Sequence, residues 1–581
     1  MEDKKVLLSV HDLEVKFRVR GRILTAIRGV NLDIYENESI AIVGESGSGK
    51  SVFTKTFAGM LDSNGFINQG NIIFNDEQLA DTSVFMKNSD WNWVNFAHRE
   101  LDRYAKLELG ADIYRQMLEL KAQKKEKSTL SEQEQKKFDD EIQDLTFQKV
   151  EMSNFKLTID PKEKQKIKEL AAQIEDFEKK IKALEAEKKA RIKEHALATR
   201  QDSAYLQEYA RREAELKAAY AKAIDGEISQ ATSDRNEILA KEIYLSVGRF
   251  GYRARIRNLK KLLAAFKKAM TLGIDLDNEK ERNGVFDSVV FRVRYLDETP
   301  EKLHGTCILN LAKIQYAKDW TQIRGGKIAT VFQDPMTSLN PIITIGKQIT
   351  SVILKHQNCS EIEARERALV LMKKVGIPNA ENRFDDYPFQ YSGGMRQRIV
   401  IAIALSCQPK ILICDEPTTA LDVTIQAQIL RLLKQLQKEF GFTIVFITHD
   451  LGVVANIADR VAVMYAGQIV ELGSVEEVFY DPRHPYTWAL LSSLPQLAQR
   501  NTKLYSITGT PPSLYNKIVG DPFAPRNPYC LKIDTLMDSP MFQVSETHFA
   551  KTWMLDPRAP KVEKPEIIQN IHEKLMHSFN I

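Results

Sequence analysis

The chain has 581 residues, which is too long for one ordinary domain and suggests about three to four domain equivalents. Its 82 basic and 78 acidic side chains nearly cancel to a net charge of +4, which argues against a nucleic-acid-binding chain as a whole, and 43% hydrophobic residues are enough for packed cores. No apolar run approaches the ~18 residues of a membrane span, and five cysteines without paired spacing predict a reduced, intracellular protein.

Residues 1–84 contain short strand-like runs around a glycine-rich loop. Apolar and polar residues alternate over residues 13–17, and a continuous apolar run covers 39–43, as expected of a buried strand. Further strands are expected at residues 24–27, 30–34 and 71–74. A helix is expected at residues 52–59, directly after the loop. These pieces suit a mixed sheet wrapped round a nucleotide site.

The loop between the buried strand and the helix has the composition of a phosphate-binding P-loop. Its residues are Gly44, Glu45, Ser46, Gly47, Ser48, Gly49, Lys50 and Ser51. Glycines let backbone N–H groups wrap a phosphate without a Cβ in the way, and the helix N-terminus adds partial positive charge. Lys50 should reach the β- and γ-phosphates, and the Ser51 hydroxyl should hold Mg²⁺. The motif alone predicts binding of a nucleoside triphosphate.

From residue 85 to 319 the composition is charged and helix-forming, rich in Lys, Glu, Gln and Ala. Apolar residues recur there at alternating spacings of three and four over three heptads: Ile167, Leu170, Ile174, Phe177, Ile181 and Leu184. A shorter apolar stripe upstream, with a turn at residues 159–161, predicts an antiparallel helical hairpin of the coiled-coil type. Two interpretations stay open: an arm that grips a partner, or a solvated insertion that packs mainly on itself.

Residues 320–480 return to a globular composition in which strands alternate with helices. Strands are expected at residues 328–332, 411–414, 443–447 and 461–465, which points to an α/β core with a largely parallel sheet. The second of these strands ends in Asp415 and Glu416, at the sheet edge where ligands of α/β proteins bind. Asp415 should hold Mg²⁺, and Glu416 is placed to polarise the attacking water as general base.

A second candidate anion site lies before the apolar helix expected at residues 399–406. Ser392, Gly393 and Gly394 stand at its start, where bare N–H groups and the helix dipole attract an anion. One P-loop already cradles its own phosphates, so a second such site makes sense if it closes over the nucleotide of another subunit. An ordinary capped helix start is the alternative interpretation.

The remaining residues are Pro-rich and irregular and predict a small C-terminal appendage. The expected organisation is therefore a nucleotide-binding α/β core in two parts, residues 1–84 and 320–480, with a mainly helical insertion at 85–319 and an appendage at 481–581.

Together these motifs resemble those of the ABC-type ATPases. The signature motif of that family is matched by Ser392, Gly393, Gly394, Met395, Arg396 and Gln397. Gln333 matches its Q-loop, Asp422 its D-loop and His449 its switch histidine, and Phe17 lies where the family often has an aromatic that stacks on adenine.

The resemblance implies an ABC nucleotide-binding domain with a helical subdomain. Two such ATPases would pair head to tail, with ATP between the P-loop of one and the Ser-Gly-Gly of the other. In that arrangement Gln333 would touch Mg²⁺, His449 would hold the γ-phosphate and the water in line, and Gln397 and Asp422 would belong to the nucleotide site.

The chain is similar in particular to the oligopeptide and dipeptide permease ATPases of the D type, over residues 1–84 and about 320–555. The matching runs are residues 332–341, 392–398, 415–423, 484–487 and 509–512. This resemblance implies the ATP-hydrolysing subunit of an ABC importer that energises peptide uptake. Its partners would be a second ATPase like the F subunit, two integral membrane permease subunits and an extracellular peptide-binding protein, with this chain peripheral on the cytoplasmic face of the cell membrane.

Two departures from the family pattern matter. Lys50 and Gln333 are separated by the insertion, where the family has only a few tens of residues. Relatives often carry four C-terminal cysteines that bind an iron–sulfur cluster, and the corresponding positions here are Asp521, Asn527 and, nearby, Asp534 and Thr552. The lone Cys530 cannot ligate a four-iron cluster, so we expect no iron–sulfur cluster.

Two other classes of ABC ATPase remain as alternatives. ATPases of chromosome maintenance and repair also carry inserted coiled coils, but the insertion here is short, precedes Gln333, and belongs to a chain of balanced charge. A translation factor of the ABC type usually needs two ATPase cassettes in one chain, and only one P-loop is present. A steep fall of DNA affinity with salt would favour the repair alternative.

Overall fold

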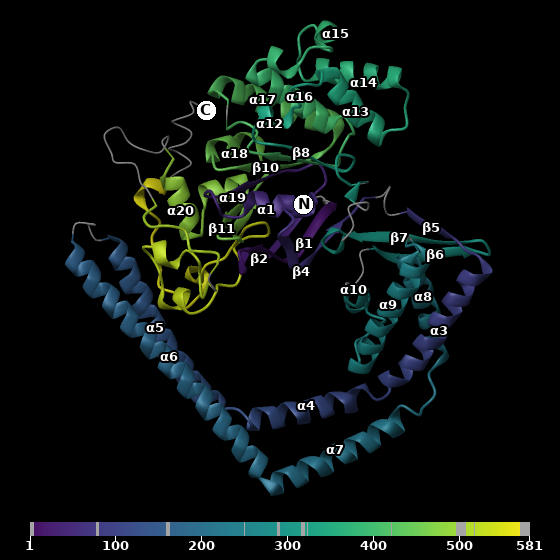
Figure 1. Ribbon diagram of the computed structural model, residues 1–581, viewed down its shortest axis with the longest axis vertical. Coiled ribbons are helices and arrows are strands. Elements are labelled where there is room, and N and C mark those ends of the chain that lie inside the picture. The colour runs from purple at the N-terminus through teal and green to yellow at the C-terminus, as the bar shows by residue number, and fades with distance from the viewer. Residues whose placement is uncertain are drawn as a thin grey trace. The chain divides into compact units, whose positions relative to one another are not determined.

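The computed structural model describes residues 5–76, 81–158, 163–248, 250–286, 291–314, 320–321, 323–419, 421–494, 507–515 and 518–569. The chain forms two compact units (Figure 1). The first comprises Met1–Phe74 and Ile314–Ile581, and the second comprises Asn75–Lys313.

The first unit is built on a sheet whose strand order, within the described residues, is β13-β14-β12-β11-β3-β10-β9-β8. Neighbouring strands from β11 to β8 are parallel, and the remaining three extend the sheet in antiparallel fashion. The bounds are β3 Ser39–Val43, β8 Ile328–Val331, β9 Ile411–Asp415, β10 Thr443–Thr448, β11 Arg460–Tyr465, β12 Gln468–Ser474, β13 Phe542–Gln543 and β14 Phe549–Ala550. The strands expected at 39–43, 328–332, 411–414, 443–447 and 461–465 are confirmed, whereas β12 was not expected.

An antiparallel layer made of N-terminal strands belongs to the same unit. In this layer β1 (Val6–Val19) pairs with both β2 (Arg22–Tyr35) and β4 (Gly65–Phe74). The runs expected at residues 24–27 and 30–34 are two parts of the single strand β2. The sheet content of the unit is therefore mixed, as the sequence predicts.

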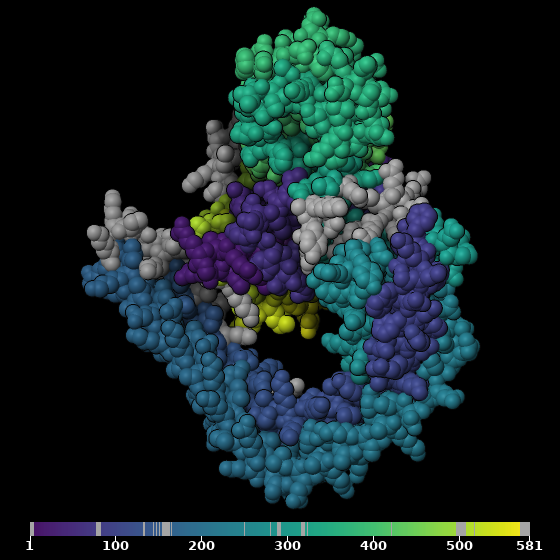
Figure 2. All heavy atoms as spheres, turned by 45° about the vertical axis from the view of Figure 1, so that its right-hand side comes forward, coloured from purple at the N-terminus to yellow at the C-terminus, as the bar shows by residue number. Residues whose placement is uncertain are grey.

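Helices cover the main sheet and form a helical subdomain in the first unit. Their bounds are α1 Lys50–Phe57, α12 Pro335–Ser338, α13 Ile345–His356, α14 Glu361–Lys374, α15 Ala380–Arg383, α16 Gly393–Leu405, α17 Val423–Phe440, α18 Leu451–Ile457, α19 Val475–Tyr480 and α20 Pro485–Ser492. Val43 of the sheet shares one hydrophobic core with Ile353, Ile399 and Leu433 of these helices. In the space-filling view the side chains of α13 to α16 form one continuous green body (Figure 2).

The C-terminal region is less separate than the sequence suggests. Its strand β14 pairs with β12 and so extends the main sheet, and Phe523 is fully buried in the hydrophobic core of the unit. The Pro-rich composition correctly indicates few long elements, but it does not reveal that short segments contribute strands and core side chains. Much of the region from 481 onward is therefore integral to the first unit.

The second unit combines an antiparallel sheet with long helices. Strand β7 (Lys302–Asn310) pairs with β5 (Asp81–Phe85) and β6 (Phe291–Thr299). Most of β5 falls within residues 1–84, which were expected to form the first part of the core. In the structure β5 belongs to the second unit. The helices are α3 Asn88–Glu108, α4 Ala111–Lys127, α5 Glu132–Thr158, α6 Lys164–Gln201, α7 Ser203–Ala223, α8 Gln230–Val247, α9 Tyr252–Leu272 and α10 Glu279–Phe286.

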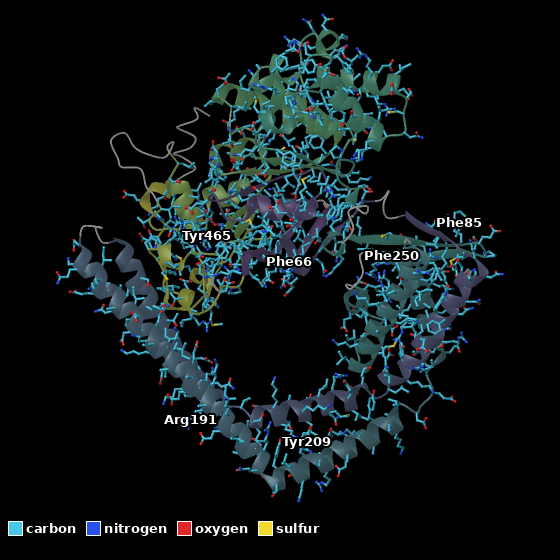
Figure 3. All side chains as sticks on the ribbon, viewed as in Figure 1. Phe66, Phe85, Arg191, Tyr209, Phe250 and Tyr465 are labelled. Atoms are coloured by element: carbon cyan, nitrogen blue, oxygen red, sulfur yellow. The ribbon has the colours of Figure 1, made fainter. Side chains whose placement is uncertain are left out.

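The helices of the second unit pack mainly in pairs and small groups. Helix α8 contacts β6, β7, α3 and α9, whereas α5 lies along α6 and α4 along α7. The heptad side chains of α6, such as Ile174 and Ile181, are half-buried while most of their neighbours are exposed. Between α4 and α7, Lys124 Nζ lies 4.1 Å from the ring centroid of Tyr209, which is labelled in Figure 3. The turn expected at residues 159–161 lies outside the described residues.

Within the part of the chain that the structure describes, no helix is both long and apolar enough to cross a lipid bilayer.

Candidate functional site

The parallel strands of the first unit place the predicted P-loop, acids and His449 at one edge of the sheet. Strand β3 lies between β10 and β11, and β9 lies on the other side of β10. In register, Val43 is opposite Thr448 and Ile447 is opposite Asp415. Because all three strands run in the same direction, the P-loop, the two acids and His449 follow their carboxyl ends together.

The P-loop connects β3 to α1 with a backbone that requires glycine. Gly44 has φ +152°, and a Cβ there would lie 2.1 Å from the carbonyl oxygen of Met464. Gly49, at φ +102°, is the N-cap of α1, so no side chain caps the first N–H groups of that helix. The Ser48 hydroxyl is buried in the same loop without a partner among the described residues. Bare helix N–H groups and an orphaned buried hydroxyl fit a bound phosphate.

Lys50 is folded onto its own loop. Its Nζ donates to the carbonyl oxygens of Gly44 at 2.7 Å and Glu45 at 2.9 Å. Burial lowers the pKa of the Lys50 ammonium, while the carboxylates of Glu416, Asp415 and Glu45 oppose that shift. A buried cation that donates to carbonyl oxygens is placed to exchange them for phosphate oxygens, which carry negative charge.

Ser51 and Asp415 form the oxygen-rich part of the site. The Ser51 hydroxyl donates to Asp415 Oδ1 at 3.0 Å. Burial raises the pKa of Asp415, although this hydrogen bond and the nearby ammonium groups of Lys55 and Lys50 favour its charged form. A bound divalent cation would offset the cost of burying this carboxylate.

Glu416 has polar partners on both carboxylate oxygens. Gln333 Nε2 and Thr419 Oγ1 donate to its Oε2 at 3.2 and 3.1 Å, and His449 Nδ1 lies 3.1 Å from its Oε1. The backbone of Glu416 is in the left-handed region, at φ 47°, and its N–H donates to the carbonyl of Ile447 at 3.0 Å. Strained backbone of this kind is concentrated at functional sites, where the surrounding structure enforces it.

The donor set fits Mg²⁺ better than a metal that requires a protein cage. Among the described residues there is no group of three or more His, Cys, Asp or Glu side chains that could hold a metal ion. Ser51 and Asp415 offer a hydroxyl and a carboxylate, which are hard oxygen ligands. Mg²⁺ usually keeps several waters and is bound by one or two protein oxygens plus substrate phosphates.

The signature residues lie at the start of α16. Ser392 is its N-cap, and its hydroxyl accepts a hydrogen bond from the Met395 N–H at 3.4 Å. Gly394 is tightly packed, since a Cβ there would lie 2.9 Å from Ile425. Asp422 similarly caps α17 by accepting from the Ile425 N–H at 2.9 Å. The starts of α16 and α17 therefore lie side by side in the first unit.

Two residues predicted to contact nucleotide are mostly buried. Gln397 is 0% exposed, and neither of its side-chain polar atoms has a partner among the described residues. Phe17 is 9% exposed, with its ring against Gly65. Lys50 and Ser48 of the P-loop are also mostly buried, so burial does not decide the matter, and nucleotide contact by Gln397 and Phe17 stays a prediction.

The structure adds three residues to the site that the sequence analysis did not single out. Thr419 contacts Glu416, as described above, whereas Tyr486 and Arg526 contact Glu45 of the P-loop. Thr419 and Tyr486 lie within runs that resemble the permease ATPases, and that resemblance could have pointed to both residues. No local pattern connects Arg526 to a loop 481 residues earlier in the chain.

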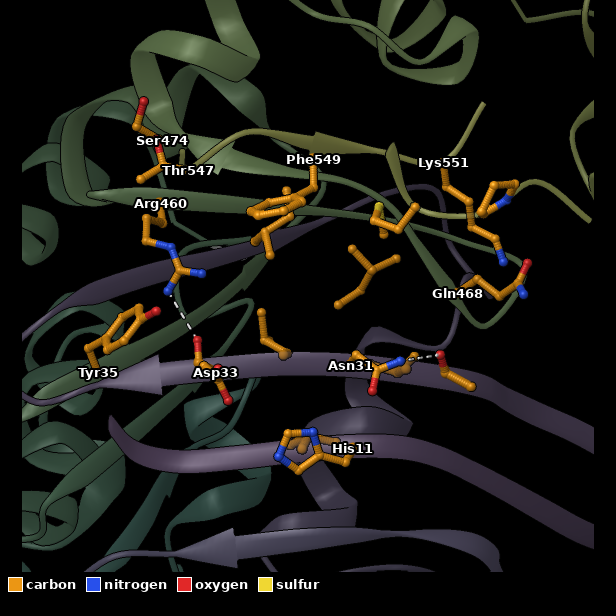
Figure 4. A pocket seen from close by; sticks show the side chains of 18 of the residues that line it. His11, Asn31, Asp33, Tyr35, Arg460, Gln468, Ser474, Thr547, Phe549 and Lys551 are labelled. Carbon is orange, nitrogen blue, oxygen red and sulfur yellow. Dashed lines mark hydrogen bonds between the residues drawn. The ribbon is translucent and has the colours of Figure 1, made fainter. Parts of the chain in front are cut away.

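A separate cavity of about 820 Å³ lies beside β2 and the C-terminal strands (Figure 4). Asn31, Arg460, Gln468 and Lys551 are among its lining residues, and no P-loop residue is. Several of its polar groups are occupied by protein partners: Arg460 donates to the Asp33 carbonyl at 3.0 Å, and Lys551 Nζ and Gln468 Nε2 donate to Asp538. This cavity is therefore distinct from the phosphate site.

Two models of known protein families match the chain. The ABC transporter family model matches residues 27–240 and 288–419. A second model, the C-terminal region of oligopeptide/dipeptide transporters, matches residues 470–533. The first match includes both the P-loop and the Asp415–Glu416 pair.

Curated relatives agree with the family models. The chain is 68% identical over 266 residues to the oligopeptide transport ATP-binding protein AmiE of Streptococcus pneumoniae, which is 46% of this chain and 75% of the relative. It is 58% identical over 263 residues to OppD of Bacillus subtilis (45% and 74%), also an oligopeptide transport ATP-binding protein. It is 61% identical over 246 residues to the dipeptide transport ATP-binding protein DppD of Lactococcus lactis (42% and 70%). The chain therefore belongs to the ABC transporter family, among its oligopeptide and dipeptide transport ATP-binding proteins.

Proposed function

We propose that this chain is the ATP-hydrolysing subunit of an ABC importer that energises uptake of oligopeptides or dipeptides. The observation that carries the proposal is the meeting of Lys50, Ser51, Asp415 and Glu416 at one sheet edge, in a chain whose relatives are peptide transport ATP-binding proteins. The DNA-acting alternative has no support among these relatives.

The chemistry of the site follows from its residues. The P-loop N–H groups and Lys50 would bind the β- and γ-phosphates of ATP, and Ser51 and Asp415 would hold Mg²⁺, to which Gln333 adds an amide oxygen. The cation would neutralise charge on the phosphates. Glu416, held by Gln333 and Thr419, would accept a proton from the attacking water as general base.

His449 is placed to orient this step. Its Nδ1 lies 3.1 Å from Glu416 Oε1, so this direct contact can fix the orientation of the carboxylate that would accept the proton. The side chain is 58% exposed, which leaves the other ring nitrogen open to a γ-phosphate. Its role would be to keep the phosphate and the water in line.

The signature residues would serve a second subunit. Ser392, Gly393 and Gly394 stand at a helix start in the same chain as a complete P-loop, so they are available to close over nucleotide bound by a partner ATPase. Asp422 would border the same interface. The partner would be an F-type ATPase, and two membrane permease subunits and an extracellular peptide-binding protein would complete the importer, with this chain peripheral on the cytoplasmic side of the membrane.

The inserted residues would act as a coiled-coil arm within this assembly. The half-buried heptad face of α6 against α5 supports a coiled-coil hairpin. The proposed organisation keeps the ATPase core in two parts around the insertion, and the bounds of the compact units support an insertion at residues 75–313 in place of 85–319, with the C-terminal region at 481–581.

The test is to purify the tagged chain from its own membranes in mild detergent and to reconstitute the recovered complex in liposomes. We expect stoichiometric recovery of two integral membrane proteins and a second ATPase, and ATP-dependent uptake of a labelled peptide. The Lys50→Ala variant of the same complex is the control and should bind peptide without transporting it. Recovery with DNA or ribosomes and without membrane subunits would refute the importer assignment.

A further inference from the structure

The P-loop contains an acid where phosphates are to bind. Glu45 directly follows Gly44, and its carbonyl oxygen accepts a hydrogen bond from Lys50 Nζ. A carboxylate this close to a triphosphate would repel it, and the repulsion would be strong because the loop is partly shielded from water. The loop therefore needs a compensating charge that is not Lys50, since Lys50 is required by the phosphates.

Arg526 supplies that charge from the C-terminal region. Its two terminal nitrogens donate to the two carboxylate oxygens of Glu45, at 2.7 and 3.1 Å. The Arg526 side chain is 5% exposed, and it also donates to the Tyr465 hydroxyl at 3.2 Å and the Thr508 carbonyl at 3.1 Å. Burial opposes the charge of Arg526, but the hydrogen bonds to Glu45 and Tyr465 raise its pKa above the ordinary value. Bidentate geometry also fixes the orientation of the carboxylate.

Tyr486 holds the backbone of the same residue. The Glu45 N–H donates to the Tyr486 hydroxyl at 2.8 Å. Tyr486 is fully buried against Tyr465 and Phe523, with ring centroids 4.5 and 5.3 Å away, and Tyr465 is labelled beside the C-terminal segment in Figure 3. Rigid, packed rings leave the hydroxyl little freedom to move. Both contacts to the P-loop thus come from residues beyond 480.

We propose that Arg526 and Tyr486 are positioning residues for ATP binding, through which the C-terminal region cancels the charge of Glu45 and fixes the entry of the P-loop. The inference rests on the proposed binding of ATP at this loop. It gives the C-terminal region a direct influence on nucleotide affinity. ATP would bind tightly only when that region is folded onto the P-loop.

The test measures the affinity of the purified full-length chain for ATP and Mg²⁺ by isothermal titration calorimetry. In Arg526→Gln the Glu45 charge is left uncompensated, and we expect affinity to fall by about tenfold or more. In the double variant Glu45→Gln with Arg526→Gln both charges are gone, and we expect affinity to return to within about threefold of the wild type. Rescue of this kind separates charge compensation from a merely structural role, which the second substitution would not restore.

Two further variants keep the test decisive if Arg526→Gln folds poorly. Tyr486→Phe keeps the ring packing and removes the acceptor of the Glu45 N–H, so affinity should fall about three- to tenfold with little change in melting temperature. The matched control, Arg558→Gln, removes an exposed arginine of the same C-terminal region that contacts Asp556 and not Glu45, and it should bind ATP as the wild type does.

The outcomes separate this inference from the proposed function. A wild-type chain that binds no ATP would overturn both. A wild-type chain that binds ATP, with Arg526→Gln and Tyr486→Phe binding equally well, or a double variant as weak as Arg526→Gln alone, would overturn the positioning role and leave the ATPase assignment intact.

Discussion

Glu416 is the residue on which the proposed chemistry depends most directly. Its carboxylate contacts Gln333, Thr419 and His449, and its backbone stays at φ 47° because the N–H bonds to Ile447. These contacts fix the orientation of the carboxylate beside the phosphate site. A neutral amide of the same shape would keep most of the contacts but could not take a proton.

The Glu416→Gln variant should therefore separate binding from hydrolysis. We expect ATP affinity within about threefold of the wild type and turnover lower by ~10²-fold or more, as for loss of a general base. Phosphate release by the purified complex measures the turnover, and calorimetry measures the binding. Turnover that survives the substitution would refute the assigned role.

Asp521 makes stability depend on pH. Burial raises its pKa to about 7, with Asp534 and Asp538 adding to the shift, from 3.8 when unfolded. Between the two pKa values Asp521 is protonated in the folded chain and ionised in the unfolded chain. The contribution of Asp521 to stability is therefore complete below about pH 4 and is lost as pH rises through 7. Its carboxylate also accepts from the Phe523 N–H at 2.8 Å, which an amide oxygen can replace.

We expect Asp521→Asn to flatten the fall in melting temperature between pH 5.5 and 8.5. The melting temperature of the variant should still fall somewhat as pH rises, because burial also raises the pKa of Asp534. The control is Asp556→Asn: hydrogen bonds from Arg558 lower the pKa of that carboxyl to about 2, outside the window. Equal slopes in the wild type and Asp521→Asn would contradict the prediction.

The strand–loop–helix element from β3 to α1 tolerates substitution unevenly. A Cβ on Gly44 would meet the Met464 carbonyl at 2.1 Å, whereas Gly47, at φ +80°, has nothing within 4 Å of a Cβ. Gly44→Ala therefore has to displace backbone, while Gly47→Ala has only the left-handed conformation to overcome, about 1–2 kcal/mol. We expect Gly44→Ala to lower the melting temperature and ATP affinity much more than Gly47→Ala. Similar melting temperatures for the two variants would contradict the close approach of Gly44 to the Met464 carbonyl.

The sequence correctly predicted the elements that a short run of residues defines. The P-loop, β3, β9 and β10 follow from short runs of glycine and apolar residues, and the two acids lie at the end of β9, where the pattern predicts them. Strand β12 was missed although Ala466 and Gly467, both at positive φ, make a two-residue hairpin turn between Tyr465 and Gln468. The Arg526–Glu45 pair could not be predicted, because nothing in either local sequence specifies a partner 481 residues away.

At the scale of the whole molecule, the proposed site belongs to one unit. The P-loop, Gln333, the signature residues, the acids and His449 all lie in Met1–Phe74 or Ile314–Ile581. The 266 residues matched to AmiE are 75% of that relative but 46% of this chain, so the relative is the shorter protein. The second unit therefore contributes none of the proposed site residues.

Replacing residues 75–313 by a flexible Gly/Ser linker should leave nucleotide binding intact. We expect ATP affinity within about threefold of the full chain, since no proposed contact is removed. Calorimetry on the purified variant measures this, with the same deletion carrying Lys50→Ala as the non-binding control. A soluble, folded deletion variant that fails to bind ATP would show that the second unit contributes to the site.

The position of β3 between β10 and β11 has a consequence for biosynthesis. Both neighbours of this strand emerge from the ribosome about 400 residues after it does. At roughly 5–20 residues per second, β3 and its P-loop wait on the order of 20–80 s for their partners. The whole of the second unit is made during that interval and can fold first. The ATP site is thus assembled late, from a strand whose partners β10 and β11 are made about 400 residues after it.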